Sequence, residues 1–449
     1  MNEIFELQNP WRKPTYVFPV EKAIPRTLLV DLKQSLASPE ISVVIGARQV
    51  GKTFLLRQLI RSLTESEGCD RRQIFYFDLD SFPLISFVQN LPEFIRFIEA
   101  LGVPEKTSYI FFDEAQRLPN CGLTLKQYYD LARPIKFIVS GSSTLEIKSQ
   151  VRETLVGRKR VFHLRPVSFM EAAAFWGFEF ASASLRQLYF ENEKALHYLQ
   201  RYLKYGGYPA VVCAEDESQR IRLLSEIYQS YVQKDISDFL KVEDVAGFNR
   251  LVVQLAAGTA QLLNIHELSK VTRLSRYFVD KYLQMLRDTY VIDLVLPYFS
   301  NIGKAVVKMP KLFFADLGLR NSIQYQSLLP ATFTEMGHLA ENFVYSELAN
   351  TLPSGNLWFW RTPQGTEIDF IYQAGGEITP IEVKFQEAET AVIPKAIRSF
   401  AEAHKVSHAI VLTKKLWSEK KDGKLIVRFM PVWMAAKIPE ILKMDKFDF

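Results

Sequence analysis

The stretch from Gly46 to Thr53 constrains the fold of this chain more than any other feature. Its letters, GARQVGKT, fit the pattern G-x-x-x-x-G-K-[ST] of a phosphate-binding P-loop. The flanks read as a buried strand over 41–45 and a helix over 53–63, the context that this motif requires. A chance glycine loop is the alternative, which the specificity of the pattern disfavours. The chain is therefore expected to have an α/β fold built on a parallel sheet.

The P-loop predicts ATP and Mg²⁺ as cofactors. Backbone N–H groups of such a loop close around phosphate oxygens, and the helix N-terminus favours negative charge. Lys52 would reach the β- and γ-phosphates, and Thr53 would offer its hydroxyl to Mg²⁺. The expected nucleotide-binding residues of the loop are Gly46, Ala47, Arg48, Gln49, Val50, Gly51, Lys52 and Thr53.

A second stretch supplies the acids that a nucleotide hydrolase needs. Four apolar residues, 109–112, precede Asp113 and Glu114, which is the Walker B arrangement. Asp113 would hold Mg²⁺, and Glu114 would orient and polarise the attacking water. The alternative is a strand that ends in a solvated acidic turn, but a P-loop upstream favours the catalytic interpretation.

Two further candidates follow in the chain. The strand predicted over 135–139 ends in Ser140-Gly141-Ser142-Ser143, so Ser142 or Ser143 would bond the γ-phosphate or the lytic water. A serine-rich turn capping a helix is an equally good interpretation. Arg158, in a run of three cations, is the candidate guanidinium for the transferring phosphoryl group, in cis or from a neighbouring subunit. The alternative is a solvated cationic face.

Composition sets wider bounds. The chain has 449 residues, a formal net charge of +5 and three scattered cysteines. The mild basicity is compatible with nucleic acid, and the cysteines form neither a metal pattern nor a disulfide framework. We see no apolar signal region and no run long enough to cross a membrane, so we expect a cytoplasmic protein without membrane partners.

In sequence order, these stretches resemble one family. Further matches are Arg165 to Glu171, Tyr205 to Pro209 and Lys311 to Leu319. The chain resembles the bacterial and archaeal AAA-like ATPases that carry a C-terminal endonuclease-like domain of unknown function. The resemblance implies an AAA-type P-loop ATPase core over 1–169, a helical lid over 170–245, a winged helix over 246–308 and a restriction-endonuclease-like domain over 309–449.

The middle of the chain is interpreted as the lid and the winged helix. Residues 265–269 begin one helix, 272–275 form a turn, and 276–286 form the candidate recognition helix. In a DNA complex such a helix meets base edges while cations meet phosphates. The expected DNA contacts are Arg273, Arg276, Lys281 and Lys304. Packing against other domains or protein partners is the alternative.

The C-terminal region contains a predicted hairpin with four charges. Strands over 367–372 and 378–384 flank Gly375-Gly376, which suits a two-residue primed turn. Paired residue numbers then sum to 751, so Asp369 lies opposite Glu382 and Glu367 opposite Lys384. Strand alternation puts these charges on one face, and Ile368, Phe370, Ile381 and Val383 on a buried face.

This hairpin resembles the PD-(D/E)xK nuclease core, although Ile368 replaces the proline of the motif. The resemblance makes Asp369 and Glu382 metal ligands and Lys384 the catalytic lysine, and Glu341 matches the helical acid of that core. The alternative is a solvated charged face, but like charges directly opposite one another are destabilising unless something bridges them.

Two functions remain open at this point. The first is an ATP-hydrolysing protein that acts on DNA through the winged helix and a metal-binding nuclease-like domain. The second is a nucleotide-dependent regulatory switch whose winged helix and inert nuclease-like fold bind protein partners. A homo-oligomer is compatible with either function.

Overall fold

The computed structural model divides into two compact units, Met1–Arg165 (unit 1) and Pro166–Phe449 (unit 2). It describes residues 2–19, 22–141, 155–180, 182–229, 242–298, 309–324, 333–352, 355–444, 447 and 449. The predicted contacts Ser142, Ser143 and Lys304 lie outside the described residues.

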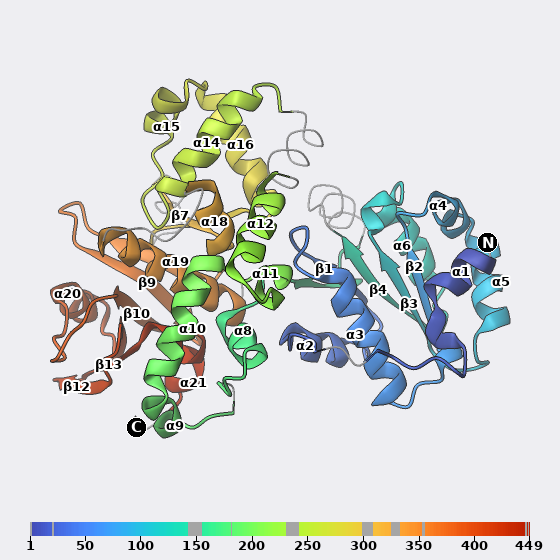
Figure 1. Ribbon diagram of the computed structural model, residues 1–449, viewed down its shortest axis with the longest axis horizontal. Coiled ribbons are helices and arrows are strands. Elements are labelled where there is room, and N and C mark those ends of the chain that lie inside the picture. Colours follow the sequence, from blue (N-terminus) through green and yellow to red (C-terminus); the bar gives the residue numbers. More distant parts are fainter. Residues whose placement is uncertain are drawn as a thin grey trace. The chain divides into compact units, whose positions relative to one another are not determined.

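Unit 1 is built on a parallel sheet with strand order β2-β3-β4-β1-β5 (Figure 1). The strands are β1 (Ile41–Ile45), β2 (Ile74–Asp78), β3 (Ser108–Asp113), β4 (Ile135–Gly141) and β5 (Lys159–His163). β1 is buried along its whole length, as a strand covered on both faces must be. The parallel pairing brings the carboxyl ends of the strands to one edge, and the P-loop follows β1 there.

The helices of unit 1 cover this sheet. They are α1 (Asn2–Gln8), η1 (Pro10–Arg12), α2 (Leu28–Ser35), α3 (Lys52–Glu65), η2 (Arg71–Gln73), α4 (Phe82–Gln89), α5 (Leu91–Leu101), η3 (Ala115–Arg117) and α6 (Cys121–Asp130). Aromatic rings fill the layer between the sheet and α5 and α6: Phe94 lies 5.3 Å from Phe77, 5.8 Å from Phe112 and 5.1 Å from Tyr128, between ring centroids.

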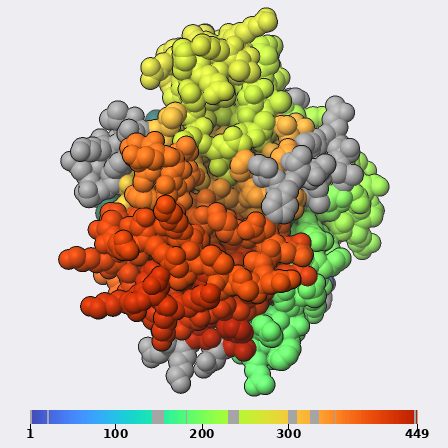
Figure 2. All heavy atoms as spheres, turned by 90° about the vertical axis from the view of Figure 1, so that its left-hand side faces the viewer, coloured from blue at the N-terminus to red at the C-terminus, as the bar shows by residue number. Residues whose placement is uncertain are grey.

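Unit 2 begins with helices and then alternates helices with two sheets. Its helices are α8 (Phe169–Phe175), α9 (Leu185–Phe190), α10 (Asn192–Tyr205), α11 (Pro209–Cys213), α12 (Glu217–Ile227), α14 (Val245–Ala257), α15 (Ile265–Thr272), α16 (Arg276–Asp288), α18 (Leu317–Gln324), α19 (Phe333–Thr351), α20 (Lys395–His404), η5 (Val432–Lys437) and α21 (Ile438–Ile441). Helices α14 to α16 form a lobe, yellow in Figure 2, that stands above the orange and red atoms of the C-terminal part of the chain.

The smaller sheet of unit 2 joins β6 (Ile292–Val295) antiparallel to β7 (Lys311–Phe314). The expected C-terminal domain over 309–449 includes β7 but not β6, so its boundary between 308 and 309 lies between two strands that pair with each other. This pairing makes β7 the second strand of the helical lobe's sheet.

The larger sheet is mixed, with strand order β12-β13-β11-β10-β9-β8. Its strands are β8 (Leu357–Arg361), β9 (Glu367–Ala374), β10 (Glu377–Lys384), β11 (His408–Thr413), β12 (Ser418–Asp422) and β13 (Leu425–Pro431). The β9–β10 hairpin has the predicted register from Ala374↔Glu377 to Phe370↔Ile381. Gly375 and Gly376 both have positive φ, 58° and 87°, as the predicted primed turn requires.

One prediction about this hairpin is wrong: its apolar residues do not share a face. Ile368 belongs to the core cluster that contains Phe400 of α20, whereas Phe370 packs 5.6 Å from Phe313 of β7, between ring centroids. The cause is a register shift against β8, where Trp358 pairs with Ile371 but Trp360 pairs with Ile368. The extra residue in β9 reverses the alternation of side chains.

Two stretches that carry the family resemblance lock together inside unit 2. Asp316 is fully buried and accepts hydrogen bonds from the backbone N–H of Gly207 (2.6 Å) and of Leu319 (2.8 Å). Gly206 has φ +69°, and a Cβ there would lie 2.4 Å from the Asp316 carboxylate. Burial raises the pKa of Asp316 to about 6. These residues therefore join α10 to α18 and have a structural role.

Candidate functional site

The P-loop lysine is held at the edge of the unit 1 sheet by the loop itself. Only 5% of Lys52 is exposed, and its ammonium donates to the carbonyls of Gly46 (3.1 Å) and Ala47 (2.7 Å). Burial lowers the pKa of Lys52 to about 8, although Glu114 and Asp113 oppose the shift. The lysine is a buried cation held by neutral carbonyls, close to the two acids that the sequence paired with it.

The loop backbone has the strained shape that phosphate binding uses. Gln49 and Gly51 have left-handed φ of 62° and 92°. A Cβ on Gly46 would lie 2.1 Å from the carbonyl oxygen of Leu164, so this position accepts only glycine. Arg26, which the sequence analysis did not identify, donates to the carbonyls of Val50 (3.1 Å) and Arg165 (2.6 Å) and so ties the loop to the segment after β5.

The first acid of the Walker B pair is buried and held on both oxygens. Asp113 is 1% exposed at the end of β3. Its Oδ2 accepts from the Tyr76 hydroxyl at 2.7 Å, and its Oδ1 accepts from Ser140 Oγ. Burial, and after it the negative charge of Asp113, raises the pKa of Tyr76, so the phenol keeps its proton and remains a donor. The expected contact in this serine-rich stretch was Ser142 or Ser143, and the role of Ser140 in holding Asp113 was not predicted.

Glu114 has a distinct backbone conformation. Its φ of 53° is left-handed, which is uncommon for a residue with a side chain and often found at functional sites. Its N–H donates to Asp113 Oδ1 at 3.2 Å, and its Oε2 accepts from Gln116 Nε2. Glu114 lies close enough to Lys52 for its charge to oppose the lowering of the lysine pKa.

Three family models match the chain. Residues 38–173 match the model of an AAA domain, which spans both the P-loop and the Walker B strand. Unit 1 therefore contains an AAA-type P-loop domain. Two domains of unknown function, DUF8612 and DUF4143, match 196–329 and 336–434.

Relatives cover most of the chain but carry no assigned activity. An uncharacterized protein of Methanocaldococcus jannaschii is 24% identical and covers 90% of this chain and 89% of its own length. One of Haemophilus influenzae is 25% identical, covering 88% and 94%. Among solved structures, the Walker-type ATPase of Pyrococcus abyssi is similar, with a TM-score of 0.45 at 14% identity, covering 70% of this chain and 99% of that one.

The residues of the AAA domain fit Mg²⁺ as well as a nucleotide. Thr53, in the first turn of α3, offers a hydroxyl, and Asp113 offers a carboxylate, which are oxygen ligands of the kind Mg²⁺ prefers. Because both Asp113 oxygens already accept hydrogen bonds, the carboxylate would act on the ion through water molecules.

Arg158 lies at the other edge of the same sheet. It precedes β5, and its carbonyl accepts from the N–H of Ile41 at the start of β1. At roughly 3.3 Å per residue, the five residues of β1 separate it from the P-loop by about 16 Å. Its side chain is 35% exposed and ion-paired with Asp130 at 3.0 Å. This position separates it from the nucleotide site of its own subunit.

The charged residues of the C-terminal hairpin form a buried cluster with a lysine that the sequence analysis missed. Lys311 of β7 is 3% exposed, and its ammonium lies 2.6 Å from Glu341 Oε1 and 3.6 Å from Asp369 Oδ1 and contacts Glu367. Burial opposes the charge of Lys311, but Glu341, Asp369 and Glu367 outweigh it and raise its pKa. Lys311 is the first residue of the stretch from Lys311 to Leu319 that carries part of the family resemblance, and this was the sequence feature that could have pointed to it.

The remaining members of the hairpin also have partners. Lys384 Nζ lies 2.5 Å from Glu382 Oε1, and Asp369 Oδ2 accepts from the N–H of Val383 at 2.8 Å. Lys384 is half-exposed, whereas Glu382 is buried, and burial, with Asp369 second, raises the pKa of Glu382 to about 7.

This acid cluster does not fit a divalent ion. Within the described ranges, no three His, Cys, Asp or Glu side chains are arranged to hold a metal. In the described part of the cluster, Glu382 Oε2 is a buried oxygen without a hydrogen-bond partner. The Lys311 ammonium already lies against Glu341 and Asp369, two of the three acids predicted to hold the ion.

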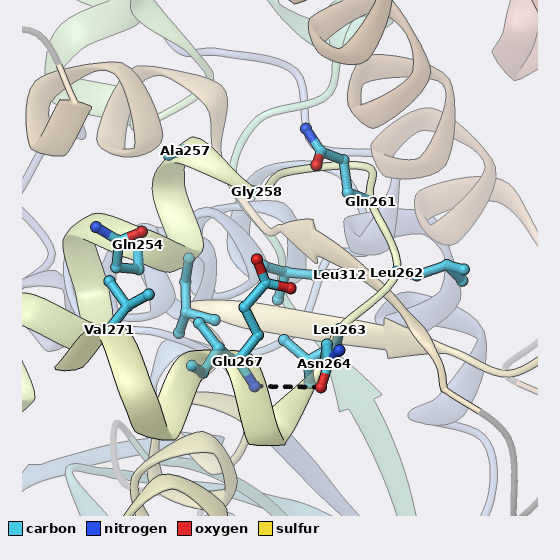
Figure 3. Close-up of a pocket in the computed structure, with 12 residues that line it drawn as sticks. Gln254, Ala257, Gly258, Gln261, Leu262, Leu263, Asn264, Glu267, Val271 and Leu312 are labelled. Atoms are coloured by element: carbon cyan, nitrogen blue, oxygen red, sulfur yellow. Dashed lines mark hydrogen bonds between the residues drawn. The ribbon is translucent and has the colours of Figure 1, made fainter. Parts of the chain in front are cut away.

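A hollow in the helical lobe is too small to be a ligand site. It encloses about 240 Å³, below the range of about 300–1,000 Å³ usual for ligand pockets, and Glu267 and Asn264 lie at its wall (Figure 3).

The described helices include none that combines the length and apolar character needed to cross a bilayer.

Proposed function

We propose that the AAA domain binds ATP with Mg²⁺ and hydrolyses it, and that the nucleotide state controls what unit 2 binds. The observation that supports this proposal is the placement of Lys52, Asp113 and Glu114 at one edge of the sheet. Phosphate oxygens would replace the carbonyls of Gly46 and Ala47 as acceptors for the Lys52 ammonium, which gains a charged partner.

The chain's own residues divide the work of hydrolysis. Thr53 and Asp113 would hold Mg²⁺, which neutralises developing charge on the phosphates. Tyr76 and Ser140 fix the Asp113 carboxylate. Glu114 would exchange Gln116 for the attacking water and polarise it.

Replacing Glu114 by glutamine tests the hydrolytic role. Glu114→Gln should keep ATP affinity and lose turnover by about 100-fold or more, as expected for removal of a general base. The matched control is Asp80→Asn, another acid at this edge, which pairs with Arg117 at 2.8 Å. ATP affinity and phosphate release are measured separately. Unchanged turnover in the Glu114 variant would remove this residue from the mechanism.

We propose that Arg158 supplies its guanidinium to the nucleotide of a neighbouring subunit. Its distance from its own P-loop and its partial exposure support action in trans. Arg158→Ala should slow turnover, whereas Asp130→Asn, which breaks the same ion pair but keeps the guanidinium, should not. Mixing Arg158→Ala with Lys52→Met protein should restore part of the activity. Equal losses in the two ion-pair variants would make Arg158 structural.

A second candidate function, duplex DNA binding by α16, is favoured by the exposure of that helix's first turn. The Arg276 side chain is 81% exposed and Tyr277 is 68% exposed, after the N-cap Ser275. Within the described ranges, the ion pair of Arg276 is a long one with Asp280, at 3.8 Å. A cation at a helix start can contact DNA phosphates. Because the acid cluster does not fit a metal, this candidate function does not include cleavage.

The DNA hypothesis has a matched control in unit 2. Arg276→Ala should weaken duplex binding and reduce the salt slope by about 1. Arg222, on α12, is 70% exposed and pairs with Glu226 at the same helical spacing at 3.6 Å, so Arg222→Ala removes an equivalent charge elsewhere. Equal affinities for both variants and the parent would favour the regulatory switch, with α16 as a contact for protein partners.

A further inference from the structure

The acid cluster of unit 2 is built around a cation that belongs to the chain. Glu341 comes from α19, Glu367 and Asp369 come from β9, and Lys311 comes from β7 of the other sheet. The Lys311 ammonium lies against all three carboxylates. In addition, it lies 5.7 Å from the centroid of the Phe359 ring, whose face also favours a cation.

The backbone on both sides fixes this lysine in place. Lys311 pairs with Val295 of β6 and with Leu262, which places it between two backbone segments. Phe314 lies three residues after Lys311 in β7. The side chain of Asn342, in α19, accepts a hydrogen bond from the N–H of Phe314 at 2.8 Å and donates one to the carbonyl of Phe314 at 2.9 Å. Glu341 directly precedes Asn342, so the lysine and its nearest acid are anchored to each other through the main chain.

The outer oxygens of the cluster are also used. Arg361 lies 3.0 Å from Glu367 Oε2, and the Val383 N–H binds Asp369 Oδ2. Two side-chain cations therefore face three carboxylates, and the buried charge is balanced within the chain to one unit. Removing a single partner from such a network leaves an uncompensated buried charge, which is strongly unfavourable.

We propose that Lys311 is the resident cation of this cluster and takes the place of a divalent ion beside Glu341 and Asp369, two of the three acids predicted to bind metal. The nuclease-like sheet is then joined to the β6–β7 sheet by a permanent ion-pair network. It binds no catalytic metal in the native protein. The acids serve to bind Lys311, and the domain acts as a rigid part of unit 2.

Metal binding to the full-length, nucleotide-free protein tests this proposal. The melting temperature of unit 2 is measured for the wild type, Lys311→Met and Lys384→Met. Each protein is measured once with EDTA and once with about 1 mM Mn²⁺. Wild type and the control Lys384→Met should shift by less than about 1 °C, whereas Mn²⁺ should raise the melting temperature of Lys311→Met by about 3 °C or more. Adding Asp369→Asn to Lys311→Met should abolish that gain.

Other outcomes are equally clear. Mn²⁺ stabilisation of the wild type that Asp369→Asn abolishes would overturn the proposal, because the native cluster would then be a metal site. A folded Lys311→Met protein that gains nothing from Mn²⁺ would overturn the claim that the lysine stands in a metal position. If Lys311→Met does not fold, Lys311→Gln replaces it, and the wild-type comparison with Asp369→Asn still decides.

Discussion

Two buried lysines, one in each unit, have opposite surroundings. Lys52 is 5% exposed, and the partners of its ammonium among the described residues are carbonyls of its own loop. Lys311 is 3% exposed, and its partners are carboxylates from two other elements. Burial lowers the pKa of Lys52 to about 8, but the carboxylates outweigh burial and raise the pKa of Lys311.

Whether a buried cation serves binding or structure depends on the charge of its partners. A lysine held by neutral carbonyls keeps most of its desolvation cost, and an incoming phosphate can offset that cost. A lysine already paired with carboxylates offers a ligand nothing comparable. Lys52 is therefore ready for an anion, whereas Lys311 is already paired within the fold.

The largest expected effect comes from removing each charge in turn. Lys311→Met should destabilise unit 2 by about 3–5 kcal/mol, because it leaves buried carboxylates without their cation. Lys52→Met should change the stability of nucleotide-free unit 1 by about 1 kcal/mol or less, because it removes a desolvated charge without stranding another. A urea titration, monitored by hydrogen exchange in peptides from each unit, measures the stability of unit 1 and of unit 2 separately. Similar losses in both would contradict the comparison.

The second expected effect concerns nucleotide affinity and has a control within unit 1. Lys136 is 2% exposed, donates to the carbonyls of Ser38 (3.0 Å) and Glu40, and burial lowers its pKa to about 8, just as for Lys52. It is the second residue of β4, however, and so lies at the amino edge of the sheet. Lys52→Met should weaken ATP binding by about 100-fold, since it removes a charge-assisted contact to phosphate. Lys136→Met should leave it within about twofold. Titration with a fluorescent ATP analogue measures both, and equal losses would assign the Lys52 effect to folding.

Much of this arrangement could be predicted from local sequence. The P-loop, the Walker B strand and the register of the β9–β10 hairpin each depend on residues close together in the chain. The turn glycines fix the hairpin register, and the motif fixes the strand–loop–helix order. These predictions needed no tertiary contact.

The predictions that failed or were missed depend on contacts between distant elements. The extra residue in β9 arises from its pairing with β8, so strict alternation could not reveal it. Lys311 reaches the acids from a different sheet. Arg158 lies at the amino edge of the sheet because it directly precedes β5. This strand carries charged residues and is largely exposed, so the sequence did not predict a strand there.

The smallest expected effect is a dependence of ATP affinity on pH that only one lysine should show. With a pKa of about 8 in the nucleotide-free protein, Lys52 loses its proton as the pH rises above 8. Phosphate binds the protonated form, so binding above pH 8 must take up a proton, and affinity should fall by up to about tenfold per pH unit. Below pH 8 this contribution is constant. Lys311, with its raised pKa, stays charged throughout, so this lysine should add no pH dependence to the stability of unit 2 over the same range.

Calorimetry in two buffers with different ionisation enthalpies measures the proton uptake directly. The control is Lys52→Arg, because a guanidinium keeps its proton over this range. That variant should bind ATP more weakly but with a flat profile above pH 8. A falling profile in Lys52→Arg would assign the titration to another group, such as Lys136, and Lys136→Met would then remove it. A flat profile in the wild type would mean that the Lys52 ammonium is as well stabilised as that of Lys311, and the contrast between the two lysines would be lost.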